Sequence, residues 1–427
     1  MEDFKTTIAE MLSKTSSDCL ASNEDILLPR YDGYALTNIT STICRLFNIP
    51  GFGEQPLADS LLSKLTGSYK NIVLLLVDAL GFQLLEKLMA SGYASFWQNR
   101  EAESVYFPLT SISPSTTASA LTTIWTGVSP ITHGIIGYEM WHKELGMVIN
   151  NILHAPMSFF GEVGTLKHAG FDPMQFLNRP TLGQHLIQHG ISASAFMHYA
   201  IGSSGLSSMH LDKIALHGYV NESDMWVSIR NLLNNNPKGR HFVYAYWSMV
   251  DTLTHRFGLN DERIAVAFSD FSRMIEEVFV GKLANNRKED TLLILTADHG
   301  SVYTPRYDDF DLRNHPDLMN MLRIQPTCEH RLAFLYTKPG MDPDVRAYFA
   351  QKWPGKFTII TGIDAIESGL FGIGPKISAA SDRVGDLVAI GLGDAYLWWS
   401  PKPNVMLGRH GGLHPSEMLI PFYALPL

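Results

Sequence analysis

Three short segments of the chain are almost entirely apolar, and each is followed closely by an aspartate. They span residues 71–77 (NIVLLLV), 241–250 (HFVYAYWSMV) and 291–296 (TLLILT), and the aspartates are Asp78, Asp251 and Asp298. Apolar runs of this length are typical of strands buried on both faces of a parallel sheet. Because open α/β sheets place their active sites at the carboxyl ends of the strands, we expect the three carboxylates to lie at one edge.

Amphipathic segments between these runs predict helices that cover the sheet. Their apolar positions recur with helical spacing over residues 82–91, 181–190 and 261–280, and earlier helices are expected at 2–14, 36–47 and 57–65. A further strand is expected at 192–197. The sequence therefore predicts an α/β fold with a mostly parallel central sheet flanked by helices.

The pattern changes after residue 324, where short strands and helices alternate. Strands are expected at 331–336 and 358–361, and helices at 343–352 and 363–370. We interpret residues 325–381 as a small α+β insert, and we expect strands at 387–390 and 395–399 to return to the main body. The predicted organisation is an N-terminal lead-in packed on the core (1–70), a catalytic α/β domain (71–324 and 382–427) and this insert.

The composition is that of an ordinary globular protein, with 45% hydrophobic and 18% charged residues and a net charge of −9. No basic run is present, so a nucleic-acid polymer or an anionic membrane surface is not expected as a partner. The longest apolar run is too short to span a bilayer, and the N-terminus lacks the pattern of a signal peptide. Cys19, Cys44 and Cys328 form no CxxC pair, which indicates a reducing compartment and hence a cytoplasmic location. Nothing in the composition fixes an oligomeric state.

The stretch 109–138 (LTSISPSTTASALTTIWTGVSPITHGIIGY) carries the first candidate chemistry. Ser115 is the expected N-cap of a helix, which places Thr116 and Thr117 in its first turn. Unpaired backbone N–H groups and the helix dipole favour an anion there. A hydroxyl at this point can serve as a nucleophile toward a phosphoryl or sulfuryl group; the plainer interpretation is that these residues only cap the helix and form turns.

Histidines accompany two of the aspartates and recur near the C-terminus. Asp251 and His255 are four residues apart, Asp298 and His299 are adjacent, and His410 lies in a glycine-rich turn. Singly, such residues also occur in turns and as helix-surface pairs. Together they offer mixed N and O ligands without a thiolate, which suits two divalent metal ions, zinc as the first choice and manganese as the second. Such a pair promotes in-line displacement at phosphorus and activates an otherwise weak threonine hydroxyl.

The order of these fragments resembles the alkaline phosphatase superfamily, and within it the type I phosphodiesterase/nucleotide pyrophosphatase family. The resemblance covers roughly residues 71–420 and is carried by Asp78, Thr117, Thr126-Gly127, His133-Gly134-Ile135, Asp251, His255, Asp298, His299 and His410. The spacing from the nucleophile to Thr126-Gly127 selects Thr117 over Thr116. The resemblance implies one ion held by Asp78, Thr117, Asp298 and His299, and a second held by Asp251, His255 and His410.

The chain departs from the family pattern at the position of an asparagine that holds a phosphoryl oxygen, which is Tyr138 here. Tyr138 and Arg409 are the candidate phosphate contacts, with Asn150 or Asn151 as possible substitutes for the missing asparagine. His414 follows His410 in the same turn and is the alternative last ligand. The sulfatase branch is not expected, because no C/S-x-P-x-R motif occurs.

We therefore expect a two-metal phosphoric ester hydrolase, a phosphodiesterase or nucleotide pyrophosphatase that forms a phospho-threonine intermediate on Thr117. Its substrate would be a small-molecule phosphate ester or a nucleotide. The alternatives are a phosphomonoesterase or phosphonate hydrolase of the same superfamily, or a metal-binding regulatory protein without turnover.

Overall fold

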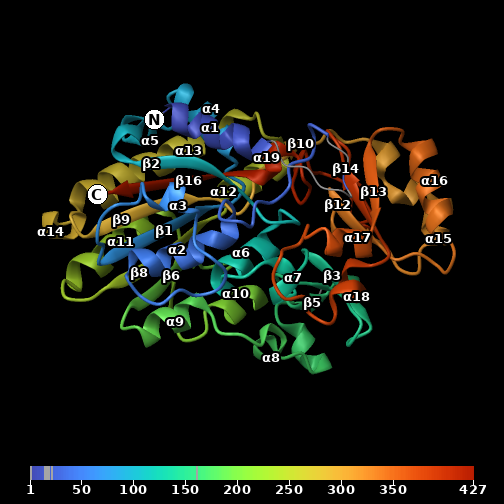
Figure 1. Cartoon of the computed structure of the whole chain (residues 1–427), viewed down its shortest axis with the longest axis horizontal. Coiled ribbons are helices and arrows are strands. Elements are labelled where there is room, and N and C mark those ends of the chain that lie inside the picture. Colours follow the sequence, from blue (N-terminus) through green and yellow to red (C-terminus); the bar gives the residue numbers. More distant parts are fainter. Residues whose placement is uncertain (1, 14–19, 21–22, 160–161) are drawn as a thin grey trace.

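Two seven-stranded sheets lie next to each other along the long axis of the molecule, with helix α6 (Thr117–Thr126) between them (Figure 1). The structure is a computed structural model that describes residues 2–13, 20, 23–159 and 162–427. Cys19 and the predicted end of the first helix at Lys14 lie outside the described residues.

The large sheet confirms the predicted α/β architecture. Its strand order is β2-β16-β9-β1-β8-β6-β7, and the neighbours β9, β1, β8, β6 and β7 all pair in parallel. The C-terminal strand β16 is antiparallel to both β9 and β2. The strands are β1 (Asn71–Val77), β2 (Val105–Thr110), β6 (Ser192–His198), β7 (Ala215–Tyr219), β8 (His241–Trp247), β9 (Thr291–Thr296) and β16 (Leu419–Pro426).

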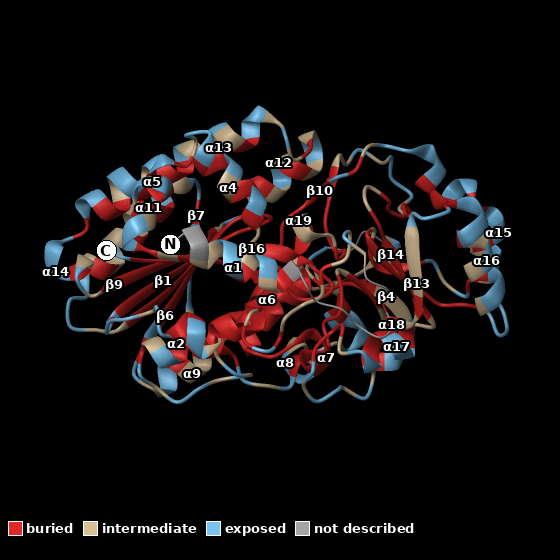
Figure 2. Ribbon diagram, turned by 45° about the horizontal axis from the view of Figure 1, so that its top comes forward, coloured by how far each residue is buried: buried red, intermediate tan, exposed pale blue. Residues whose placement is uncertain are grey.

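Helices cover both faces of this sheet, and their buried sides face the strands (Figure 2). One face carries α4 (Phe82–Ala90), α5 (Ser95–Asn99), α11 (Glu222–Asn235), α12 (Met249–Phe257) and α13 (Glu262–Met274). The other carries α2 (Ile39–Leu46), α6 and α9 (Leu182–Gln188). Every residue of β1, β8 and β9 is buried, as their continuous apolar runs predict.

The second apolar run is shorter as a strand than the sequence predicts. β8 ends at Trp247, and α12 begins at Met249, so Asp251 and His255 lie on a helix rather than after a strand end. An apolar strand end and the apolar first turn of a helix cannot be told apart by periodicity alone.

The smaller sheet is antiparallel and has the order β13-β14-β12-β11-β3-β4-β5. Its strands are β3 (Glu139–His142), β4 (Met147–Asn150), β5 (Ala155–Pro156), β11 (Thr327–Glu329), β12 (Leu332–Leu335), β13 (Phe357–Thr361) and β14 (Leu387–Gly391). The predicted insert helices are present as α16 (Asp342–Lys352) and α17 (Gly362–Glu367). The strand predicted at 387–390 is wrong in its placement, since β14 pairs with β12 and β13 rather than in the main body. The division into domains stays a prediction.

A buried ion pair joins the smaller sheet to the C-terminal segment. The Arg331 guanidinium donates to Glu417, with 2.9 Å between Nη2 and Oε2, and both side chains are fully buried. Glu417 also accepts the backbone N–H groups of Gly412 and His414. Breaking a buried pair leaves an uncompensated charge, so this contact fixes the segment that follows His410.

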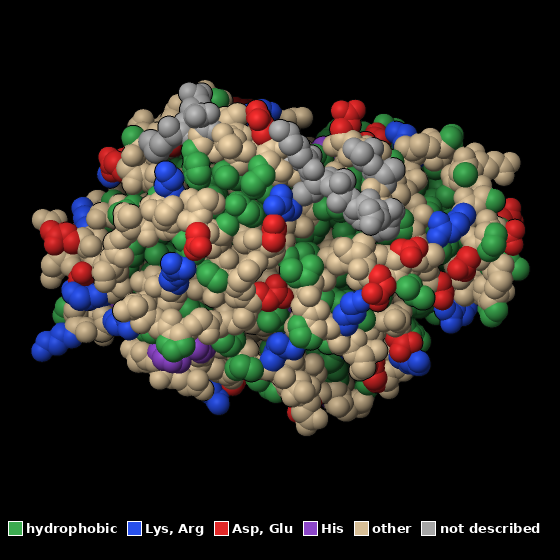
Figure 3. All heavy atoms as spheres, viewed as in Figure 1, with side chains coloured by type: hydrophobic (Ala, Val, Ile, Leu, Met, Phe, Trp, Pro, Cys, Tyr) green, Lys and Arg blue, Asp and Glu red, His purple; other side chains and the backbone are tan. Residues whose placement is uncertain are grey.

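The surface shows no concentration of one charge on the face drawn in Figure 3, where acidic and basic side chains are interspersed. Across the part of the chain that the structure describes, no helix has both the length and the apolar character needed to cross a membrane.

Candidate active site

The stretch around Thr117 presents one side chain to solvent. All residues from 111 to 137 are buried except Thr117, which is the first residue of α6. The N-cap is Thr116, with φ −133° and ψ 144°, and not Ser115 as the sequence predicts. The Ser115 hydroxyl instead donates to the carbonyl of Gly412 at 2.8 Å. Thr117 therefore lies at the helix start, where the free backbone N–H groups favour an anion.

Serine hydroxyls fasten this stretch to the segments that carry the candidate ligands. Ser111 Oγ donates to the carbonyl of Asp298, and Ser115 Oγ accepts the N–H of Gly411 at 3.2 Å. These hydrogen bonds reach the end of β9 and the C-terminal turn. They therefore fix the position of Thr117 relative to the candidate ligands on those two segments.

The first ligand group follows the strands β1 and β9 and consists of Asp78, Asp298 and His299. One ligand atom from each lies within 4.8 Å of the others, and all three side chains are buried. His299 Nε2 is 3.6 Å from Asp78 Oδ1, 3.3 Å from Asp298 Oδ2 and 3.2 Å from Thr117 Oγ1. The structure thus brings together the four residues assigned to one ion.

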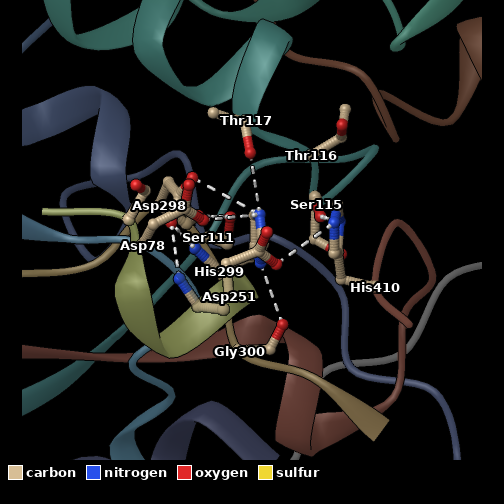
Figure 4. A network of polar contacts seen from close by, with 12 residues as sticks. Asp78, Ser111, Ser115, Thr116, Thr117, Asp251, Asp298, His299, Gly300 and His410 are labelled. Carbon is tan, nitrogen blue, oxygen red and sulfur yellow. Dashed lines mark hydrogen bonds and ion pairs between the residues drawn. The ribbon is translucent and has the colours of Figure 1, made fainter. Parts of the chain in front are cut away.

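The second ligand group joins helix α12 to the C-terminal turn and consists of Asp251, His255 and His410. Asp251 Oδ1 lies 3.2 Å from His255 Nε2 and 3.8 Å from His410 Nε2. The rings of His299 and His410 stack with centroids 3.8 Å apart, so the two groups adjoin. Figure 4 shows the Thr117 hydroxyl pointing at His299, with Asp78 and Asp298 on one side and His410 on the other.

The three histidines share one hydrogen-bonding arrangement. In each ring Nδ1 faces a backbone carbonyl, at 2.8 Å from Gly408 O for His255, 2.9 Å from Gly300 O for His299 and 3.1 Å from Ser115 O for His410. A carbonyl can only accept, so Nδ1 carries the proton and Nε2 presents its lone pair to the site. Metal-bound histidines are commonly oriented in this way.

The carboxylates leave three oxygen atoms buried without a hydrogen-bond partner. They are Asp78 Oδ1, Asp251 Oδ1 and Asp298 Oδ2, the same atoms that face the histidine Nε2 atoms. Their other oxygens are satisfied in two cases, by Tyr246 for Asp78 and by the N–H groups of Ala79 and His299 for Asp298. Carboxylate oxygens facing imidazole lone pairs repel one another unless a cation lies between them. The residues present therefore fit two divalent cations.

Burial and like charges shift the pKa values of two of the candidate ligands away from their usual values. Desolvation raises the pKa of Asp78 well above its usual value, and the neighbouring Asp298 and Asp251 raise it further. Desolvation lowers the pKa of His410 well below its usual value, helped by His299 and His255. The site therefore disfavours a proton on His410 and an uncompensated negative charge on Asp78. Of these two costs, a bound cation would directly offset only that of the negative charge on Asp78.

A cavity of about 560 Å³ opens in front of Thr117. Tyr138 lies in its wall, and the Tyr138 oxygen accepts the amide of Asn150, with 2.6 Å between OH and Nδ2. The Tyr138 proton therefore remains available for a ligand. Asn151 is turned away, with its amide donating to Gly137 O at 2.7 Å, so only Asn150 of the two substitute candidates lines the cavity.

Arg409 and His414 do not face the cavity. The Arg409 guanidinium is buried, lies 3.7 Å from the centroid of Tyr396 and donates to Thr304 and Asn404. His414 caps helix α19 (Pro415–Met418) by accepting the Ser416 N–H, and its Nε2 lies 3.6 Å from Asp25. Neither the Arg409 nor the His414 side chain contacts the six candidate ligands described above.

Two acidic residues of the cavity wall, Glu139 and Glu329, are absent from the candidates drawn from the sequence. Each is a single acid among apolar or mixed neighbours, in IGYEMW and TCEHR. Neither residue lies in a strand predicted from the sequence, and a single acid of this kind does not indicate which cavity its side chain lines.

Comparison with known proteins identifies a family and several similar folds. The sequence model of the type I phosphodiesterase/nucleotide pyrophosphatase family matches residues 72–413. None of the curated proteins compared with the chain matches it. Murine ectonucleotide pyrophosphatase/phosphodiesterase 5 is 17% identical with a TM-score of 0.62, covering 83% of this chain and 87% of its own. An inactive variant of that murine protein in complex with AMP gives a TM-score of 0.61, at 17% identity and the same coverage.

Phosphonoacetate hydrolase from Sinorhizobium meliloti 1021, in complex with phosphonoformate, is also similar. It is 16% identical with a TM-score of 0.56, covering 82% of this chain and 89% of its own. At these identities the structural likeness shows the fold alone.

His410→Ala and His414→Ala separate the two candidates for the last ligand. We expect His410→Ala to weaken the second equivalent of zinc by at least about tenfold, because it removes a nitrogen that faces Asp251. His414→Ala should leave zinc affinity near that of the wild type. Calorimetric titration of the metal-free proteins measures both, and the opposite ranking would assign the ligand to His414.

Proposed function

The chain belongs to the type I phosphodiesterase/nucleotide pyrophosphatase family, a family of phosphoric ester hydrolases, and we propose that it cleaves a phosphodiester or nucleotide pyrophosphate bond with Thr117 as the nucleophile. The observation that carries this proposal is the position of the Thr117 hydroxyl. Thr117 is the one residue between 111 and 137 that is not buried, and its hydroxyl lies 3.2 Å from His299, where the two groups of candidate ligands adjoin.

Two divalent cations fit the site, with zinc as the first choice and manganese as the second. Asp78, Asp298 and His299 together with Thr117 would hold one, and Asp251, His255 and His410 the other. Bound there, they would lower the pKa of the threonine hydroxyl and offset negative charge on the leaving oxygen. The unpartnered carboxylate oxygens and the outward-facing Nε2 atoms support this assignment.

Thr117 Oγ attacks phosphorus in line with the leaving oxygen. The new Oγ–P bond forms as the bond to the leaving alcohol or phosphate breaks, giving a phospho-threonine that retains the remaining ester. Water then breaks the Oγ–P bond and restores the hydroxyl. The N–H groups at the start of α6 and the Tyr138 hydroxyl, which lines the cavity, would donate to the non-bridging oxygens as charge develops on them.

The substrate is proposed to be a small phosphodiester or a nucleotide. The complex of the murine neighbour with AMP supports a nucleotide, and a cavity of about 560 Å³ is of the size that holds such ligands. The phosphate contacts near Thr117 are neutral donors, since Arg409 is engaged elsewhere. Neutral donors suit a monoanionic diester better than a monoester dianion.

A cytoplasmic location is proposed as well. Cys44 and Cys328 are buried free thiols, which supports a reducing compartment.

Thr117→Ala tests the nucleophile. We expect turnover to fall by roughly three orders of magnitude or more, because the covalent step needs the hydroxyl, while Thr117→Ser should retain part of it. Thr116→Ala is the control, since the Thr116 hydroxyl donates to Glu329 at 2.5 Å rather than facing the ligands. Steady-state rates with an aryl phosphodiester report the effect. An inactive Thr116→Ala beside an active Thr117→Ala would show that the motif is misaligned.

Tyr138→Phe tests the substrate preference. The wild type should show a higher kcat/KM for an aryl phosphodiester than for the matching monoester. Tyr138→Phe should lose about 1–3 kcal/mol of transition-state stabilisation for the diester, the cost of one positioned donor to a charged oxygen. The contrary result is a wild type that prefers the monoester, loses this preference in Arg409→Ala and is unchanged by Tyr138→Phe. That result would show that Arg409, and not Tyr138, contacts the phosphate.

A further inference from the structure

One edge of the large sheet is covered, and the other is open. At the covered edge, helix α1 (Glu2–Ser13) packs against β2, and five of the six residues of β2 are buried (Figure 1). The open edge is β7, where Ala215, Leu216 and Gly218 are exposed and no strand of the described chain pairs with the outer side. An open strand edge is a template for pairing with another chain.

The outward backbone groups of β7 belong to Leu216 and Gly218. The carbonyl of Tyr219 accepts the N–H of Tyr199 at 2.9 Å, so the backbone groups of Tyr219 face β6. Successive residues of a strand in a parallel pair direct their N–H and C=O groups to alternate sides. The groups of Leu216 and Gly218, three and one positions before Tyr219, therefore face away from β6. The edge thus offers two N–H donors and two C=O acceptors.

The sequence of β7 contains nothing that discourages pairing. The strand reads ALHGY, without the charged residues or proline with which many proteins protect a sheet edge. Large apolar side chains are exposed along it and at its end. Leu216 is 42% exposed, Val220 is 64% exposed, and Tyr199, which is bonded to the last residue of the strand, is 63% exposed. A contact that removes these side chains from water would be favourable.

The edge is complementary to a second copy of itself. A two-fold axis through His217 pairs two β7 strands antiparallel and sets Leu216 of each copy opposite Gly218 of the other. Because both residues face outward, each such pair exchanges two hydrogen bonds, and every outward group of the strand gains a partner. Leu216 then lies opposite a residue without a side chain, which leaves room for it on that face of the sheet.

The two neighbouring registers satisfy fewer groups. With the axis at Leu216, Gly218 lies opposite Ile214, whose N–H is already bonded within its own turn at 3.2 Å. With the axis at Gly218, Leu216 lies opposite Val220, whose N–H is already bonded to the carboxylate of Asp224 at 3.0 Å. The register about His217 is therefore the one that the hydrogen bonding favours.

The charges that flank β7 favour the same orientation. Lys213 precedes the strand and Asp224 follows it, and both residues are exposed. Antiparallel pairing brings the start of one strand beside the end of the other, so each lysine lies on the side of the acidic end of the other copy. Opposite charges placed in this way help to select the orientation of two partners.

We propose that the β7 edge is a homodimer interface, in which two copies pair antiparallel about His217 and join their large sheets into one continuous sheet. A two-fold contact uses the same edge on both copies, so assembly through it stops at two. This interface is separate from the candidate active site and does not depend on the proposed function.

Sedimentation velocity over a series of concentrations tests the assembly of the full chain. We expect a species of twice the 47.6 kDa mass of the chain. Leu216→Lys should raise the Kd of the dimer by at least about tenfold, because it places a charge on the paired edge. Its Tm at a concentration where both proteins are monomeric should stay near that of the wild type. Ile363→Lys is the matched control, since Ile363 is 68% exposed on α17 of the smaller sheet, and it should keep the wild-type Kd.

A cysteine at the axis tests the register. Cys44 and Cys328 are buried, so a Cys19→Ser background limits other cross-links. His217→Cys sets two thiols opposite each other in a pair that is not hydrogen-bonded, with Cα atoms about 4.5 Å apart, a separation that a disulfide spans. Mild oxidation should therefore give a covalent dimer. Ala215→Cys is the control, because it lies opposite Tyr219 of the other copy and should remain uncross-linked.

Three results would overturn the interface. The first is a chain that stays monomeric at every concentration up to about 100 µM. The second is a dimer whose Kd is unchanged in Leu216→Lys and that His217→Cys does not cross-link, which would place the contact elsewhere on the molecule. The third is cross-linking of Ala215→Cys in place of His217→Cys, which would show a different pairing of the strands. If Leu216→Lys does not fold, the two cysteine variants decide the matter alone.

Discussion

Three buried carboxylate oxygens without hydrogen-bond partners impose the main constraint on this molecule. Asp78, Asp251 and Asp298 each direct one such atom toward a histidine nitrogen that offers a lone pair. Inside a protein this arrangement is repulsive unless cations occupy it. The parallel sheet makes it possible, because β1 and β9 end side by side at one edge and α12 brings Asp251 to the same place.

The two sheets contribute different parts of the site. The large sheet and helix α12 supply five of the six candidate metal ligands, and the C-terminal turn supplies His410. The smaller sheet lines the cavity through Tyr138, Glu139, Asn150 and Glu329. Helix α6 connects the two, since its first residue faces the ligands and its N-cap is bonded to Glu329. The Thr116–Glu329 hydrogen bond therefore links the smaller sheet to the start of the helix that carries Thr117, the proposed nucleophile.

The parts of the fold with local signals could be predicted from the sequence. Strands β1 and β9 have the predicted bounds. Their runs of seven and six consecutive buried residues fit a strand that is covered on both faces. Asp78, Asp298 and His299 lie together because the carboxyl ends of the parallel strands β1 and β9 share one edge. The strands β12, β13 and β14 of the smaller sheet could be predicted, but its pairing could not. The sheet pairs β3, at Glu139, with β11, at Cys328, nearly two hundred residues later, and no local pattern encodes such a partner. The sequence does not distinguish Thr116 from Ser115 as the helix N-cap, because both residue types suit that position. Only the structure shows that the Ser115 hydroxyl donates a hydrogen bond to the Gly412 carbonyl instead.

The most direct test of the central claim is to trap the covalent intermediate on the enzyme. A single turnover of an aryl phosphodiester, quenched in acid and followed by peptide mass spectrometry, should place a phosphoryl adduct on Thr117 alone. Stereochemistry at a chiral phosphorus should be retained overall, because two in-line displacements invert it twice. An adduct on another residue, or inversion of configuration with no adduct, would contradict the account.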